Sequence, residues 1–289
     1  MDSNGAPKKK SLTQSLVAIL ASLGALLAYV AVLGAVSIAS GVVIRLANPG
    51  ATEEKITELT YSCATLSGIV GNLVAALLLF VILIIIKRKI APTIAARKFS
   101  LLAVAPCILL GAAFNLFSEC IISLIPFPES VLNTYREIYS YLGKGSLIVE
   151  IVGIVVITPI VEEIFFRGIG YRLIRKRCPV PVAVILSSLL FGLAHGNLLS
   201  FVYTTVLGAI LAVCFEAHGS IFVPILIHAS FNATSYFAET VLADRTPEAA
   251  IAAAMTGAVC ALAVFAVIRT GRIYKEKHNS QSEIRTELE

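Results

Sequence analysis

Two carboxylates and one guanidinium lie inside an otherwise apolar part of the chain, residues 158–167. Glu163 and Arg167 are four positions apart with the glutamate first, which is the favourable geometry for an ion pair on one helical face. Glu162 is turned about 100° away from Glu163 by the helical period and lacks that partner. We therefore expect two carboxylates with different tasks: Arg167 holds one as an anion, and the other is free to exchange a proton.

Two further polar motifs lie later in the chain, again within apolar sequence. Each has two residues at an i,i+4 spacing, Phe191 with His195 and His228 with Asn232. This spacing places both side chains of a motif on one face of a helix. His228 and Asn232 could form an oxyanion hole for a tetrahedral intermediate, or they could bridge neighbouring transmembrane helices. Taken singly, each of these motifs favours the structural role.

The composition places these polar groups in a membrane. Of 289 residues, 57% are hydrophobic and 14% are charged, a balance that excludes a soluble globular surface. An ionisable side chain at membrane depth is costly unless it is paired or hydrated, so such residues usually have a function. The six cysteines show no spacing typical of zinc ligands, and we interpret them as small buried hydrophobic residues.

Eight apolar stretches of the chain are comparable in length with the roughly 20 residues that a helix needs to cross a bilayer. They predict an all-α fold, a polytopic transmembrane bundle of about eight helices. The stretches are residues 16–43, 66–86, 101–125, 147–171, 180–195, 198–215, 221–237 and 249–268. The alternative for the fourth stretch is a helix that ends at Phe166 with its charges in water, but the basic cluster at 172–177 is a more natural boundary.

Lysine and arginine are distributed unevenly over the alternate loops of this topology. The N-terminus, the even-numbered loops and the C-terminal tail hold 17 of them, and the odd-numbered loops hold 5. The larger group lies within residues 8–10, 87–98, 172–177 and 269–285, and the smaller group is Arg45, Lys55, Arg136, Lys144 and Arg245. Because cytoplasmic loops retain Lys and Arg, we predict that both termini are cytoplasmic. The net charge of +5 then reflects topology and anionic lipid, and no nucleic-acid partner is expected.

Three motifs thus follow one another on separate apolar stretches: Glu162-Glu163-x-x-x-Arg167, Phe191-x-x-x-His195 and His228-x-x-x-Asn232. The ordered set resembles the signature of the CAAX-protease and bacteriocin-processing family, also called the Abi family. The resemblance covers about residues 145–240, and the chain shows no departure at the motif positions. The expected parts are a basic N-terminus (1–15), three helices with their loops (16–144), a catalytic core with helices four to seven (145–240), an eighth helix (241–268) and a polar cytoplasmic tail (269–289).

The resemblance implies an intramembrane glutamate-dependent endopeptidase of the type II CAAX prenyl endopeptidase kind, with a cavity open to the cytoplasm. It implies that Glu162 is the general base that activates water, aided by His195. His228 and Asn232 would stabilise the oxyanion. The implied supporting residues are Glu163, Arg167 and Phe191. The residues themselves agree on Glu162, because a general base must be free to take a proton and this carboxylate has no arginine neighbour.

No cofactor is expected, and Zn²⁺ is the mechanistic alternative. If a metal is present, its ligands are Glu162, His195 and His228, with an open position for water. The chain lacks the His-Glu-x-x-His pair that places two ligands on one helix turn, and Asn232 is a poor zinc ligand.

The two histidines are expected at different depths. His195 lies about 22 Å along its predicted helix from Val180, whereas His228 lies only about half as far along the helix that begins at Ile221. A tilted helix or an indented cavity would bring the two histidines level. If His195 lay more than a helix diameter from Glu162, the three residues could not share one site.

Two non-enzymatic functions are the alternatives, a proton-coupled transporter and a membrane binding or immunity protein that sequesters a peptide. The polar residues Asn72, Asn115 and Glu119 suit a transport path, but no inverted repeat is visible. The expected partners are membrane lipids and a peptide or protein substrate, with or without a lipid at its C-terminus. The expected location is a cell membrane crossed several times, with a bacterial plasma membrane favoured and the endoplasmic reticulum as the alternative.

Overall fold

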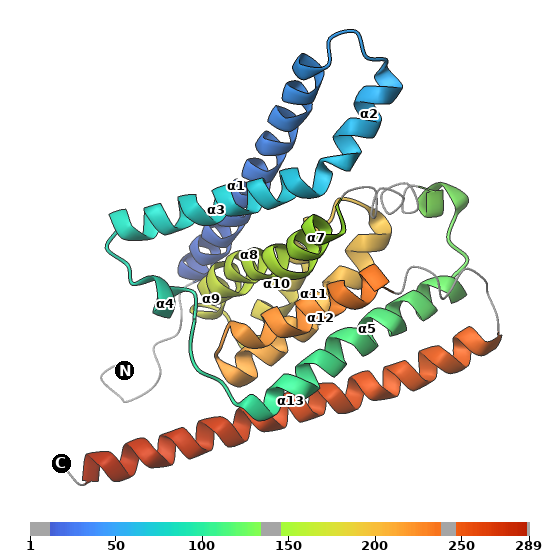
Figure 1. The fold of residues 1–289 in the computed structure, drawn as a ribbon. Helices are drawn as coiled ribbons and strands as arrows, with labels where there is room; N and C mark the ends of the chain where they lie inside the picture. Colours follow the sequence, from blue (N-terminus) through green and yellow to red (C-terminus); the bar gives the residue numbers. More distant parts are fainter. Residues whose placement is uncertain (1–11, 134–145, 238–246, 288–289) are drawn as a thin grey trace.

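The computed structural model describes residues 12–133, 146–237 and 247–287, and in these parts of the chain every regular element is a helix (Figure 1). The earlier elements are α1 (Leu12–Ala47), α2 (Glu53–Ser62), α3 (Ala64–Ile85), α4 (Ile90–Thr93), η1 (Leu101–Ala103) and α5 (Val104–Leu124). The later elements are α7 (Leu147–Glu150), η2 (Ile151–Ile157), α8 (Thr158–Glu163), η3 (Ile164–Tyr171), α9 (Arg172–Arg175), α10 (Val180–Leu193), α11 (Leu198–His218), α12 (Phe222–Phe237) and α13 (Pro247–Glu287). The predicted all-α fold is confirmed.

Every predicted apolar stretch forms helix, but the helices differ in length. Within the described residues, five are long and apolar enough to cross a membrane: Leu12–Ala47, Ala64–Ile85, Leu101–Leu124, Leu198–His218 and Ala250–Lys277. α10 is apolar but has only 14 residues, and α12 has 16. Large apolar side chains such as Leu77 and Leu262 are exposed on the outside of the bundle, as is typical of a surface that faces lipid.

Two helical segments were not predicted. α13 continues to Glu287, through the residues that we assigned to the polar tail, because residues 269–287 contain strong helix formers and no proline. α2 is a short polar helix whose N-cap is Thr52. The Thr52 side chain accepts a hydrogen bond from the N–H of Lys55, and acidic residues follow in the first turn.

The continuous helix from α7 to α9 is wound alternately as α-helix and π-helix. η2 and η3 are π-helical, and α8 between them carries Glu162 and Glu163. Pro159 in α8 has no N–H to donate, so the turn before it cannot form a complete α-helical ladder. A π-helical turn contains more residues than an α-helical turn and often occurs at a functional site. The winding therefore determines the direction in which the side chains of α8 point.

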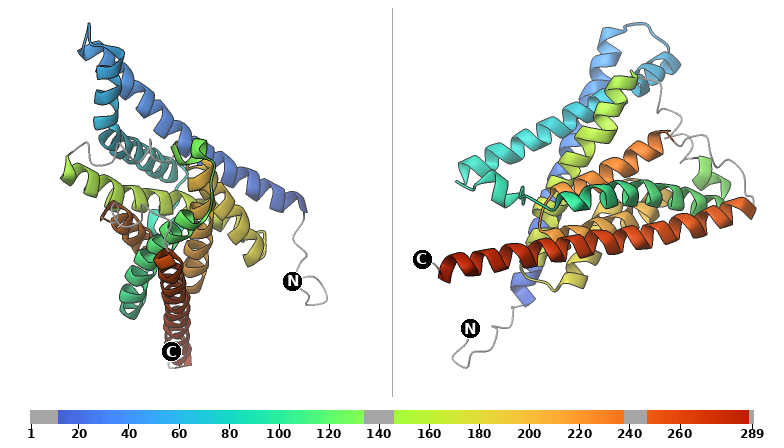
Figure 2. Two further views of the ribbon diagram at one scale, coloured as in Figure 1. Left: turned by 90° about the vertical axis from the view of Figure 1, so that its right-hand side faces the viewer. Right: turned by 60° about the horizontal axis from the view of Figure 1, so that its bottom comes forward.

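Glycine residues let the central helices pack closely. α5 packs against α12 and α13, α10 packs against α11, and α1 packs against α3 (Figures 1 and 2). A Cβ added to Gly111 in α5 would overlap the carbonyl oxygen of Ile227 and lie 2.8 Å from the backbone nitrogen of Phe231, both in α12. A Cβ on Gly208 in α11 would lie 3.1 Å from the Cα of Ser188 in α10. Small residues at such contacts are typical of helices in membranes.

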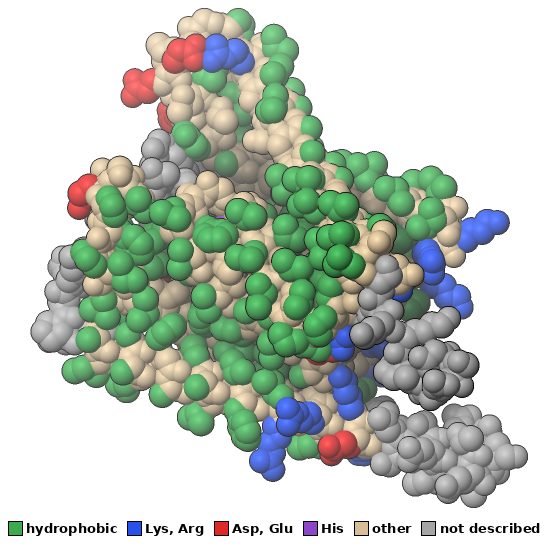
Figure 3. Space-filling view, turned by 180° about the vertical axis from the view of Figure 1, so that it is seen from behind, with side chains coloured by type: hydrophobic (Ala, Val, Ile, Leu, Met, Phe, Trp, Pro, Cys, Tyr) green, Lys and Arg blue, Asp and Glu red, His purple; other side chains and the backbone are tan. Residues whose placement is uncertain are grey.

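The two ends of the bundle differ in charge. The start of α1 and the end of α13 lie at one end, together with the ends of α3 and α9 (Figure 1). Side-chain contacts hold this end together, because Arg177 bonds Gln14 of α1, and Lys275 of α13 donates to the carbonyl oxygen of Glu216 in α11. Figure 3 shows Lys and Arg side chains gathered at this edge of the molecule.

We call this the basic end, and its described basic residues include Lys87, Arg88, Arg97, Arg172, Arg175, Lys176, Arg177, Arg269, Arg272 and Lys275. The opposite end, where α10 meets α11 and where α12 finishes, is the distal end. The assignment of the basic end to the cytoplasm stays a prediction from the charge pattern.

Gly111→Ala should weaken the contact between α5 and α12, because the added methyl group meets backbone atoms rather than a flexible side chain. Overpacking typically costs about 1–3 kcal/mol, so we expect a lower melting temperature for the variant in detergent. Gly34→Ala in α1 is the matched control, because a Cβ at Gly34 meets nothing within 4 Å. Equal melting temperatures for the two variants would contradict this account of the packing.

Candidate active site

A buried ion pair between Glu163 and Arg167 lies at the centre of the site. Both side chains are 0% exposed, and Nη1 of Arg167 lies 2.8 Å from Oε1 of Glu163. Nη2 of Arg167 donates to the carbonyl oxygen of Gly208 in α11 at 3.0 Å. The guanidinium carbon lies 4.4 Å from the centre of the Phe191 ring in α10, a cation–π contact. The i,i+4 pair expected from the sequence is present, and Arg167 also connects η3 to α10 and α11.

His228 in α12 lies between the two carboxylates. Its Nδ1 is 3.1 Å from Oε1 of Glu163, and its Nε2 is 3.8 Å from Oε2 of Glu162. An ionised carboxylate only accepts hydrogen bonds, so Nδ1 of His228 carries a proton and donates a hydrogen bond to Glu163. The contact with Glu162 is too long for a direct hydrogen bond, but it is short enough for the two groups to interact electrostatically.

Glu162 is the carboxylate that faces the cavity. Its side chain is 14% exposed, whereas the side chain of Glu163 is fully buried. Oε2 of Glu162 is buried and has no hydrogen-bond partner among the described residues. A buried acceptor of this kind is costly until a donor reaches it. Oε2 is therefore the atom to which a water molecule or a substrate N–H would donate.

His195 reaches the same cavity although it lies just beyond the end of α10. Nδ1 of His195 is 2.8 Å from the carbonyl oxygen of Phe191, so the side chain turns back along the helix. The Phe191 ring contacts both histidine rings, with centroid distances of 4.8 Å to His195 and 5.6 Å to His228. Because the His195 side chain turns back, it reaches the Phe191 ring at the level of His228, although the sequence placed the two histidines at different depths. Because a carbonyl accepts, Nδ1 of His195 carries the proton and Nε2 of the neutral ring is an acceptor.

Asn232 is bonded to a carbonyl group that Pro159 leaves without a donor. The N–H of Thr158 bonds the carbonyl oxygen of Gly153, five residues earlier, as in a π-helix. In the same pattern the carbonyl of Ile154 would accept from residue 159, but proline has no N–H. Nδ2 of Asn232 donates to that carbonyl at 2.9 Å instead. This bond uses one N–H of the amide and leaves the second for a ligand, because an amide nitrogen carries two hydrogens.

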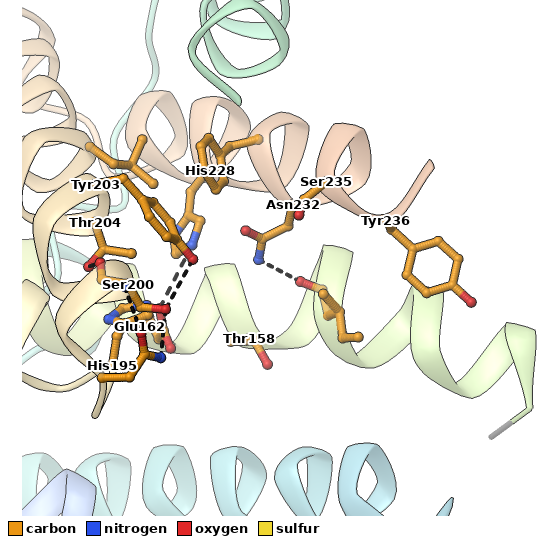
Figure 4. Close-up of a pocket in the computed structure, with 14 residues that line it drawn as sticks. Thr158, Glu162, His195, Ser200, Tyr203, Thr204, His228, Asn232, Ser235 and Tyr236 are labelled. Atoms are coloured by element: carbon orange, nitrogen blue, oxygen red, sulfur yellow. Dashed lines mark hydrogen bonds and ion pairs between the residues drawn. The ribbon is translucent and has the colours of Figure 1, made fainter. Parts of the chain in front are cut away.

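The four residues that we expected to take part in catalysis, Glu162, His195, His228 and Asn232, line one cavity of about 310 Å³ (Figure 4). The cavity is also lined by residues outside the three motifs, namely Ile154, Thr158, Asn197, Ser200, Tyr203, Thr204, Leu207, Phe231, Ser235 and Tyr236. Some of them continue a helical spacing that could have been noticed, since Ser235 follows His228 and Asn232 at i+7 and i+3 on the same face. The three expected supporting residues do not line the cavity but lie behind it, as described above for Glu163, Arg167 and Phe191.

The cavity extends from the carboxylates toward the distal end. On α12 its lining residues run from His228 to Tyr236 in the last turns of the helix, and on α11 they run from Leu207 back to Ser200 near the start. On the basic side of the ion pair, a packed layer separates the carboxylates from a second cavity, whose lining includes Tyr171, Phe215 and Glu216. Phe166, Tyr171 and Ile174 are each at most 1% exposed there.

This direction brings two expectations from the sequence into conflict. The charge pattern predicts that the basic end is cytoplasmic, whereas the family resemblance implies a cavity open to the cytoplasm. The cavity lies on the distal side of the carboxylates, away from the basic end. The two expectations disagree, and both stay predictions.

The polar residues that suited a transport path lie outside the cavity lining. Asn72 in α3 accepts a hydrogen bond from the hydroxyl of Tyr29 in α1 at 2.9 Å and donates to the carbonyl of Gly68 at 3.0 Å. Asn115 in α5 is buried at 1% exposure. The bonds of Asn72 connect α1 and α3 behind the carboxylates, which is a supporting role.

The expectation that no metal is required stays a prediction. Among the residues that the structure describes, no three His, Cys, Asp or Glu side chains converge so that they could hold a metal ion. In the alternative ligand set, Nδ1 of His195 and Nδ1 of His228 already donate to other acceptors, which leaves each ring only Nε2 as a ligand atom.

Arg167→Gln should destabilise the protein strongly, because Glu163 would stay buried without its guanidinium. Breaking a buried ion pair in this way typically costs about 3–5 kcal/mol. The double variant Glu163→Gln/Arg167→Gln removes both charges and should recover part of the loss. Unfolding of the wild type, both single variants and the double variant gives the coupling free energy of the pair. A coupling free energy near zero would contradict the central role of the pair.

The comparisons with known proteins bear on the part of the chain that forms this cavity. Residues 144–234 match the family described as Type II CAAX prenyl endopeptidase Rce1-like. Searches of curated proteins and of solved structures found no match. The matched segment contains all seven residues of the three motifs, and the match confirms the resemblance predicted from them. Residues 144–234 are thus similar to this family of membrane proteases, and the described part of the chain has five helices that are long and apolar enough to cross a membrane.

Proposed function

We propose that the chain is an intramembrane endopeptidase that hydrolyses a peptide bond with a water molecule activated by Glu162. The observation that carries the proposal is the different surroundings of the two adjacent carboxylates. Oε1 of Glu163 accepts from Arg167 and His228, and its unpartnered Oε2 lies outside the cavity lining. Oε2 of Glu162 also has no partner among the described residues, but Glu162 lines the cavity, where a substrate can reach it. A general base needs such a free acceptor within reach of the substrate.

The charges of the cluster support the same division of roles. Arg167 contributes one positive charge and the two ionised carboxylates contribute two negative charges, so one further proton makes the buried cluster neutral. If this proton is on His228, Glu162 is free to act as a base. Nε2 of His228 is then a charged donor at the edge of the cavity.

In the proposed reaction the oxygen of the water molecule attacks the carbonyl carbon of the scissile peptide bond while Glu162 takes its proton. His228 and the second N–H of Asn232 stabilise the negative charge that develops on the carbonyl oxygen. Nε2 of neutral His195 accepts a hydrogen bond from the second O–H of the water molecule, which stays on the attacking oxygen, and so orients the water. The C–N bond then breaks, and the proton held by Glu162 passes to the leaving amine.

The proposed substrate is a peptide or protein segment, with or without a C-terminal lipid, that enters the cavity from the membrane. The volume of about 310 Å³ lies at the lower end of the range for ligand sites, which suits a short extended segment. We propose that the protein works in a cell membrane, with a bacterial plasma membrane favoured, and that it needs no nucleic acid and no cofactor.

Glu162→Gln should abolish cleavage without unfolding the protein, because the amide keeps the shape of the side chain but cannot take the proton. General-base catalysis typically contributes about 10²–10⁴-fold to the rate, so a loss of this size is expected. The assay is cleavage of quenched peptides, one with a C-terminal lipid and one without, by the purified protein in detergent. Glu54→Gln, an exposed glutamate in α2, is the matched control and should keep full activity. Cleavage by Glu162→Gln at the rate of the control would exclude this mechanism.

Removal of metal ions should leave the cleavage rate unchanged. The purified protein is incubated with a strong zinc chelator, and the same quenched peptides are then added. Loss of activity that returns on addition of Zn²⁺ would overturn the proposal and favour Glu162, His195 and His228 as ligands. A protein that binds the peptides but cuts neither would instead support sequestration, and its binding should survive Glu162→Gln.

A further inference from the structure

We infer that the cavity takes its substrate from the non-cytoplasmic side of the membrane, so that the substrate is a peptide segment presented outside the cytoplasm. This inference rests on the proposed peptidase function and adds the side of access to it. It follows the charge pattern and sets aside the cytoplasmic opening that the family resemblance implies.

The distribution of basic residues gives the orientation of the bundle in the membrane. Lysine and arginine are concentrated 17 to 5 in one set of loops and ends, and the described members of the larger group meet at the basic end. The contacts of Arg177 with α1, of Arg172 with the carbonyl of Pro92, and of Lys275 with α11 show that these segments are neighbours in space. Positively charged loops are retained in the cytoplasm, so the basic end is the cytoplasmic one.

The cavity lies on the distal side of the carboxylates. Three segments line it, and each contributes residues from the middle of the bundle outward to the distal end. On the helix that carries Glu162, the lining residues continue to Thr158 and Ile154, away from α9 at the basic end. Asn197, in the connection between α10 and α11, and Tyr236, at the end of α12, line its distal part. Both are partly exposed, so no described residue seals the distal part of the cavity.

A layer of buried side chains separates the carboxylates from the basic end. On the helix that carries the carboxylates, the next residues toward the basic end are packed against the bundle. Arg167, Phe166 and Tyr171 are each at most 1% exposed. Leu211 and Phe191, from the helices opposite, are both 0% exposed. A peptide could reach Glu162 from the basic end only by displacing this packed layer, which includes the buried ion pair.

The lining also restricts the chemistry of the segment that would enter. Among the described lining residues, Glu162 is the only carboxylate, and none is Lys or Arg. The remaining polar groups are the two histidines, two amides and several hydroxyls. Uncharged donors and acceptors of this kind pair with peptide groups. A second carboxylate, the buried Glu150, lies behind the lining and accepts a hydrogen bond from the hydroxyl of Tyr236 at 2.7 Å. The preferred segment is thus an extended peptide with small or apolar uncharged residues at the cleavage site.

Accessibility of single cysteines to a membrane-impermeant maleimide tests the side of access directly. Cys63→Ser is the background, because Cys63 is the partly exposed cysteine and the other five are buried. Ser235→Cys and Thr158→Cys report on the cavity, and Lys176→Cys reports on the exposed surface of the basic end. We expect both cavity cysteines to be labelled in right-side-out membrane vesicles and Lys176→Cys to be labelled only in inverted vesicles.

Each other pattern overturns the inference. If the cavity cysteines are labelled only in inverted vesicles, the cavity opens to the cytoplasm. If Lys176→Cys is labelled in right-side-out vesicles, the bundle has the opposite orientation. If the cavity cysteines react in detergent but in neither type of vesicle, the cavity opens only to lipid.

A second assay separates failure of this inference from failure of the proposed function. Two membrane-anchored reporters carry the same uncharged peptide segment, one on each side of the membrane, and Glu162→Gln is the negative control. Cleavage of the outer reporter alone supports the inference. Cleavage of the cytoplasmic reporter alone overturns the side of access but keeps the peptidase. Labelling from outside with no cleavage of either reporter supports the access route and counts against the peptidase.

Discussion

The buried pairing of Glu163 with Arg167 determines how the rest of the site is arranged. A guanidinium away from water must be bonded on several sides, and here its partners come from three different helices. Holding Arg167 therefore fixes α10 and α11 against η3. The same oxygen of Glu163 also accepts from His228 and so positions α12. Oε2 of each glutamate lacks a partner among the described residues, but only Glu162 lines the cavity, so it is the carboxylate that water or a substrate can reach.

A second constraint comes from one missing hydrogen. Pro159 leaves the carbonyl of Ile154 without its backbone donor, and Asn232 takes that place. α12 is thus bonded to the π-wound helix at His228 and again one turn later at Asn232. These two hydrogen bonds, one helical turn apart, fix the rotation of α12 about its axis and its position along that axis. The irregular winding, which looks like a defect of the helix, is what aligns the two residues of the third motif with the carboxylates.

The sequence predicted those features that depend on one segment alone. Apolar length predicted the helices, and the helical period predicted the Glu163–Arg167 pair, because both residues lie on one helix and their distance follows from its geometry. The backward turn of His195 depends on where α10 ends, and the partner of Asn232 depends on the π-helical winding. Neither can be calculated from spacing. The direction of the cavity depends on how three segments pack together, so it could not be predicted from the spacing of the motifs.

The shortness of one helix beside the cavity has a consequence for the lipid. α10 has 14 residues and ends at both sides within the described part of the chain. At about 1.5 Å per residue it is about 21 Å long, less than the roughly 30 Å of hydrocarbon in an ordinary bilayer. A membrane adapts to such a short helix by becoming thinner around it. Lipid head groups and their water would then lie closer to the carboxylates. Local thinning of the bilayer would thus shorten the path by which water reaches Glu162.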